Sequence, residues 1–145
     1  MVATLQQDVA ITKGAEVLAC MSVKEGGLLR WYAGCCNTPI GNTMRGPKFS
    51  YVGLMHNCLE HSGKPLDEAF GPVKMRVNTT SAKQPVAATP FVTVISVLRL
   101  SGPIVMARLD GSYRRTPFFS AADLRPVAAP KVLSAEERER AYGAV

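Results

Sequence analysis

One stretch decides the fold: Arg30-Trp31-Tyr32-Ala33-Gly34-Cys35-Cys36-Asn37-Thr38-Pro39-Ile40-Gly41-Asn42-Thr43. It joins an aromatic run to a tight turn, and it holds the single tryptophan and half of the four cysteines. Residues 28–32 predict a strand that ends in this turn, because Gly, Asn and Pro surround the two thiols. Turns of this kind can aim thiolates at a metal ion. The stretch therefore predicts a β-rich fold organised around a cysteine turn.

The two adjacent cysteines leave two interpretations open. Neighbouring residues on an extended backbone point to opposite sides, so Cys35 and Cys36 reach one metal only if the chain bends sharply. In one interpretation they ligate a metal together with His56 and Cys58, which lie two residues apart in a later apolar run. In the other, Cys36 has no ligand role and Cys35 is buried or idle. Cys20 lies within an apolar strand, so we expect it in the core.

The run from Arg30 to Gly41 resembles the Arg-x-Phe-Cys-x-x-Cys-Gly-Thr-x-Leu element of the glutathione-dependent formaldehyde-activating enzyme-like family. Members of that family are small zinc proteins of β-tent fold, and the match is closest to a bacterial offshoot. The resemblance runs from about Asp8 to about Val132. It implies a zinc-bearing fold and, in active relatives, carbon–sulfur bond chemistry on a glutathione adduct.

The departures from that family concern the zinc ligands. Ala33 stands where the second thiol of the family's pair belongs, and the upstream Cys-x-Cys and Cys-x-x-Cys elements have no counterpart. If the start codon has been assigned too late, we expect genomic DNA upstream of Met1 to encode them. Tetrahedral zinc takes four ligands. We therefore expect zinc to bind weakly or not at all at the residues that remain as candidates: Cys35, Cys36, His56 and Cys58.

Two functions follow from the resemblance. The preferred one is a non-catalytic or degenerate relative, kept as a module that binds a small thiol compound such as a glutathione adduct, or a protein. The alternative is a zinc-dependent, carbon–sulfur lyase-like enzyme that acts on a thiol adduct. Arg114 and Arg115 lie beside two phenylalanines and could seat an anion. The same arginines could equally pair with Asp110 or Asp123.

Composition fits one domain over residues 1–145, which the resemblance implies to be an incomplete β-tent-like domain, with a core at about 8–132 and a short charged helical tail at 133–145. The hydrophobic share of 47% suffices for a core. The net charge is +6, but the basic residues are spread along the chain, which argues against nucleic acid as a partner. No stretch reaches the length of a membrane span, and the four cysteines do not form a disulfide framework. A cytoplasmic protein is expected.

The expected fold class is α+β, mainly antiparallel β in β-tent-like twisted sheets, with C-terminal helices. A helix starting after Thr89, broken at Ser101-Gly102-Pro103, is expected to cover the sheet, although the β-branched run from Val92 to Val97 favours a strand. Residues 134–137 form a capping box that opens the last helix. The expected strands are 8–12 and 17–21 as a hairpin, 28–32, 48–58, and 73–77 at an edge; a helical turn is expected at 66–70.

The predicted hairpin at residues 8–21 carries a consequence for assembly. The resembled family continues its sheet beyond this point, so the hairpin should present an unpaired edge. Such edges recruit other chains. The sequence therefore predicts a homo-oligomer, most simply a symmetric dimer.

Overall fold

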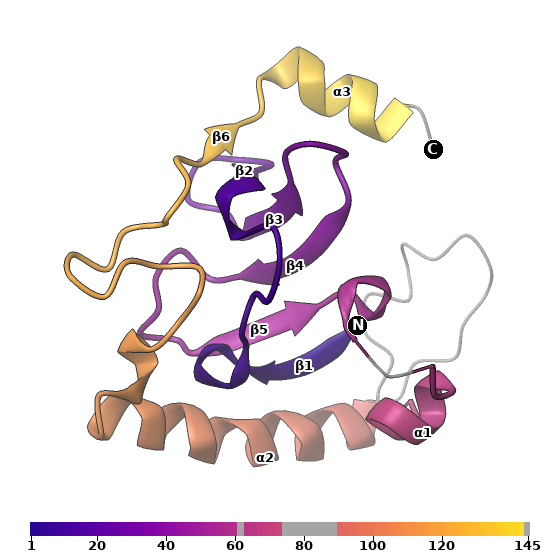
Figure 1. Cartoon of the computed structure of the whole chain (residues 1–145), viewed down its shortest axis with the longest axis vertical. Helices are drawn as coiled ribbons and strands as arrows, with labels where there is room; N and C mark the ends of the chain where they lie inside the picture. Colours follow the sequence, from indigo (N-terminus) through magenta and orange to yellow (C-terminus); the bar gives the residue numbers. More distant parts are fainter. Residues whose placement is uncertain (61–62, 74–89, 144–145) are drawn as a thin grey trace.

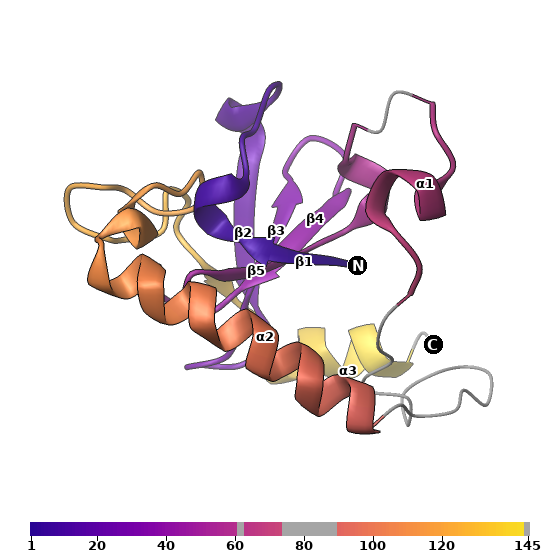
Figure 2. The ribbon, with the colours of Figure 1, turned by 90° about the horizontal axis from the view of Figure 1, so that it is seen from below.

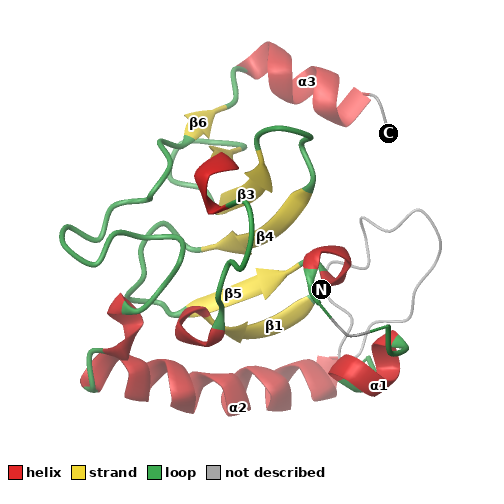
Figure 3. Ribbon diagram, viewed as in Figure 1, coloured by secondary structure: helices red, strands yellow, loops and turns green. Residues whose placement is uncertain are grey.

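A computed structural model describes residues 1–60, 63–73 and 90–143 of the chain. Those residues form an α+β fold with a mostly antiparallel six-stranded sheet, as the sequence predicts (Figure 3). The strands lie in the order β1-β5-β4-β3-β2-β6 (Figure 1). They are β1 (Val2–Leu5), β2 (Leu18–Ser22), β3 (Leu29–Ala33), β4 (Pro39–Thr43), β5 (Tyr51–Leu54) and β6 (Lys131–Val132). The helices are α1 (Leu66–Phe70), α2 (Pro90–Leu109) and α3 (Ala135–Gly143).

The N-terminal segment differs from the predicted hairpin. Strand β1 pairs with β5, and the chain then leaves the sheet in the short 3-10 helix Gln6–Asp8. The side chain of Gln6 is fully buried and donates to the carbonyls of Phe49 and Tyr51. A buried amide needs such partners, so Gln6 fixes the exit of the chain from the sheet. Residues 8–12 are therefore not a strand, and the predicted hairpin is wrong.

The edge expected at that hairpin is also partly closed. Strand β6 pairs in parallel with the end of β2, placing Met21 beside Lys131 and Ser22 beside Val132. The backbone N–H of Leu133 donates to the Ser22 carbonyl at 3.0 Å. Residues far along the chain thus cover an edge that the sequence predicts to be open.

The core lies on one face of the central strands. Trp31 is buried, and its ring centroid lies 5.1 Å from that of Phe118 and 5.9 Å from that of Phe119. The indole N–H of Trp31 donates to the Thr43 hydroxyl at 2.8 Å, which satisfies the one polar group of this large side chain. The buried cluster consists of Cys20, Leu29, Trp31, Val52, Leu54, Phe118 and Phe119. Loop phenylalanines therefore close this face, where a helix was predicted.

Helix α2 lies beside the edge strand β1, as two perpendicular views show (Figures 1 and 2). It turns Ile104 and Ala107 inward, where both are buried. The predicted break at Ser101-Gly102-Pro103 is wrong, because the helix continues through Pro103. A proline there removes one helical hydrogen bond. The Ser101 hydroxyl meanwhile donates to the Val97 carbonyl at 2.8 Å.

Other predicted elements fall into three groups. The helical turn at 66–70 and the last helix are confirmed, and the capping box forms: Ser134 and Glu137 exchange side-chain hydrogen bonds with each other's backbone N–H. The strand predicted at 48–58 is shorter, since a 3-10 helix replaces its end at His56–Cys58. Residues 74–77 of the predicted edge strand and Thr89, after which the long helix was predicted to start, lie outside the described residues. Within the part of the chain that is described, no helix is long and apolar enough to span a bilayer.

Candidate functional site

The cysteine turn connects β3 to β4. The backbone N–H groups of Ala33 and Asn37 close it, donating to the carbonyls of Thr38 and Ala33 at 2.9 and 2.8 Å. Asn37 has a φ of 58°, a left-handed conformation that asparagine tolerates better than most residues. This conformation returns the chain to the sheet, so two paired strands hold the thiols of Cys35 and Cys36.

The turn brings both thiols to the same side. Cys35 and Cys36 are exposed, and their sulfur atoms lie 3.7 Å apart. Burial of Cys35 is therefore wrong, because the backbone here is a turn and the rule for extended chains does not apply. The alternative that Cys35 is exposed but idle stays open. Cys20 is only 2% exposed, which confirms its predicted place in the core.

The pKa values of the two thiols are shifted in opposite directions. The Thr38 hydroxyl lies 3.1 Å from the Cys36 sulfur, and its hydrogen bond lowers the pKa of Cys36, aided by the Thr38 backbone and by the Cys35 thiol. The pKa of Cys35 is raised, chiefly because its S–H donates to Cys36. Hydrogen bonds to a charged form favour that form. Cys36 is thus the thiol that ionises more readily, and the thiolate is the reactive state.

His56 and Cys58 lie in the 3-10 helix after β5, at the same end of the sheet as the cysteine turn (Figure 1). The Cys58 thiol donates to the carbonyls of Met55 and Ile40 at 3.0 and 3.5 Å. Desolvation of this sulfur raises the pKa of Cys58. It is therefore a protonated donor rather than a ready metal ligand.

The four candidate ligands do not assemble as a zinc site. Within the described ranges, no three side chains of His, Cys, Asp or Glu are grouped so that they could hold a metal ion. The residues present therefore do not fit tetrahedral zinc. Weak or absent zinc binding stays a prediction.

The two arginines predicted to seat an anion lie elsewhere. Arg114 ends the 3-10 helix Ser112–Arg114, and its guanidinium lies 5.7 Å from the centroid of the Tyr113 ring. Asp110 has a lowered pKa, mainly because it accepts hydrogen bonds from Ser112, with a smaller contribution from Arg115. This helix and the β3–β4 turn lie at opposite ends of the sheet (Figure 1). An anion held by these arginines would not contact the cysteine turn.

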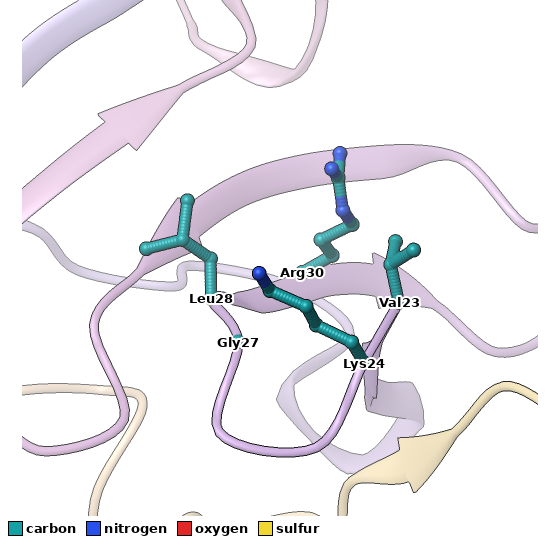
Figure 4. A pocket seen from close by; sticks show the side chains of 5 residues that line it. All are labelled: Val23, Lys24, Gly27, Leu28 and Arg30. Carbon is teal, nitrogen blue, oxygen red and sulfur yellow. The ribbon is translucent and has the colours of Figure 1, made fainter.

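A shallow pocket of about 310 Å³ lies at the turn between β2 and β3 (Figure 4). Its lining includes two exposed cations, Lys24 and Arg30. Sequence reasoning missed this pocket, although a Gly-Gly turn flanked by basic residues is a visible signal. Because β2–β3 and β3–β4 turns leave opposite ends of β3, the pocket and the thiols are separate features.

A model described as "Family of unknown function (DUF6151)" matches residues 1–129. The chain belongs to this family. The DUF6151 match includes the first five strands, the cysteine turn and the two phenylalanines that close the core. No curated protein and no solved structure matches the sequence. Nothing in the DUF6151 match bears on the formaldehyde-activating enzyme-like family, so that resemblance stays a hypothesis.

Proposed function

We propose that this DUF6151 protein is a binding module for a small thiol compound, such as a glutathione adduct, which it holds as a mixed disulfide with Cys36. The observation that carries this proposal is the exposed Cys36 sulfur, 3.1 Å from the Thr38 hydroxyl on a turn fixed by two strands. A positioned hydroxyl stabilises the thiolate that forms the bond.

The bond-forming step is thiol–disulfide exchange. The Cys36 thiolate attacks one sulfur of a disulfide such as glutathione disulfide. A new S–S bond forms, the old one breaks, and glutathione leaves as a thiolate that takes a proton from water. A free thiol reverses the step by the same route. The fraction of chains that carry the compound therefore depends on the ratio of disulfide to free thiol in the surroundings.

Cys35 is the one neighbouring thiol that could release the bound compound, but the disulfide it would form is strained. Its sulfur lies 3.7 Å from that of Cys36, close enough to attack and release the compound. Release would join adjacent residues whose Cα atoms are about 3.8 Å apart across a trans peptide. Relaxed disulfides span roughly 4.4–6.8 Å between Cα atoms. The strained product disfavours release, which supports a binding module over a dithiol oxidoreductase.

Intact-protein mass spectrometry tests the proposal. The reduced protein is incubated with glutathione disulfide near pH 7, and we expect one glutathione per chain. Cys36→Ser should abolish the adduct. The matched Cys35→Ser and Cys58→Ser variants should keep it. An adduct that survives in Cys36→Ser, or none in the wild type, would overturn the assignment.

A further inference from the structure

Helix α2 carries an apolar stripe on the side that faces away from the sheet. Phe91 is 82% exposed, Leu98 66% and Leu109 75%. The α2 stripe consists of residues whose spacing alternates between four and three: Phe91, Ile95, Leu98, Gly102, Val105 and Leu109. All six are exposed. Figure 2 shows α2 crossing the front of the molecule when seen from below.

The stripe exposes apolar side chains that a partner can cover. The opposite face of the helix carries Ile104 and Ala107, and both side chains are buried. A helix that is apolar on both sides is normally buried on both. The five apolar side chains of the stripe are between 41% and 82% exposed, and covering apolar surface of this kind with a partner is favourable.

We propose that the α2 stripe is covered by a second copy of the chain, with the two α2 helices packed antiparallel about a two-fold axis near Leu100. The spacing of four and three is the heptad pattern of a two-helix seam. The stripe is self-complementary, as a two-fold interface requires. The proposal is independent of the chemistry of the cysteine turn.

Packing at the centre of the stripe selects the antiparallel arrangement. With the axis near Leu100, Leu98 of one copy lies over Gly102 of the partner subunit. Gly102 has open space where a Cβ would lie, so it can receive that side chain. A parallel pair would instead face glycine with glycine and leave a void, which costs stability. Towards the ends, Phe91 then meets the partner's Leu109.

Charge adds a testable signature. Arg99 flanks the stripe, and in this arrangement it approaches the partner subunit's Arg99 beside the axis. Two like charges oppose association, and salt screens them. The dimer should therefore tighten as salt rises from low to moderate concentration. An acidic partner or an anionic membrane on the same stripe would show the opposite trend.

Analytical ultracentrifugation over a concentration series tests the proposal. The wild type should dimerise at concentrations on the order of 100 µM or below, and Leu98→Glu should weaken the dimer by roughly 100-fold or more. Val97→Glu is the matched control, because Val97 is 54% exposed but lies outside the stripe. It should leave the dimer intact, and Arg99→Ala should tighten it.

Circular dichroism checks that each variant keeps its helices. A wild type that stays monomeric in this range would overturn the proposal, and so would equal effects of Leu98→Glu and Val97→Glu. If Leu98→Glu does not fold, the salt dependence of the wild type and the tightening by Arg99→Ala still decide.

Discussion

At the scale of single residues, Thr38 should control the reactivity of Cys36. Thr38→Val removes the hydroxyl that lowers the pKa of Cys36. We expect slower alkylation by iodoacetamide near pH 7, and an unchanged rate at a pH where the thiol is fully ionised in both proteins. The measurement is the pH profile of the alkylation rate of Cys36, with Cys58 as an internal reference. Identical profiles would show that Thr38 does not tune the thiol.

Cys20 gives a second prediction at this scale. Burial raises its pKa from 9.0 to about 11, and nearby Arg45 lowers it slightly. Between these values the unfolded chain loses the Cys20 proton while the folded chain keeps it. The contribution of this thiol to stability is therefore complete below pH 9 and is lost as pH rises towards 11. Between pH 9 and 11, the free energy of unfolding measured in urea should decrease less steeply for Cys20→Val than for the wild type. Parallel curves for the two proteins would contradict the assignment.

At the scale of elements, the core depends on two phenylalanines outside any helix or strand. Phe118 is fully buried against Trp31, and Phe118→Ala should lower the free energy of unfolding by about 3–5 kcal/mol. Phe49 is 47% exposed and serves as the matched control. Its replacement by alanine should cost about 1 kcal/mol. Urea denaturation measures both, and equal losses would show that the Trp31 cluster is not the centre of the core.

Local signals explain which elements the sequence could predict. The strand through Trp31 and the Ser134 capping box depend on neighbouring residues, and both are confirmed. The burial of Gln6 and of Phe118 depends on contacts with residues far along the chain, which no local pattern reports. The shared side of the two thiols was missed for a related reason. It follows from the turn conformation of the backbone at Cys35 and Cys36, and neighbouring positions on an extended chain give the opposite expectation.

At the scale of the whole molecule, zinc should not hold the fold together. The chain places no group of three metal-ligating side chains within its described part. Cys36→Ser should therefore change the melting temperature little, and protein purified from zinc-replete medium should carry well under one equivalent of zinc. Elemental analysis and a thermal melt provide the measurements. A full equivalent of zinc, lost together with the fold in Cys36→Ser, would contradict this expectation.

The closure of the core by Phe118 and Phe119 also sets an order of events on the ribosome. The strands they cover end at Leu54, so five of the six strands are synthesised long before the two phenylalanines. Until those two rings emerge from the exit tunnel, Trp31 lacks both of its aromatic partners. The nascent strands therefore expose their apolar face while more than sixty further residues are translated. During this interval we expect a chaperone that binds exposed apolar surface to protect them.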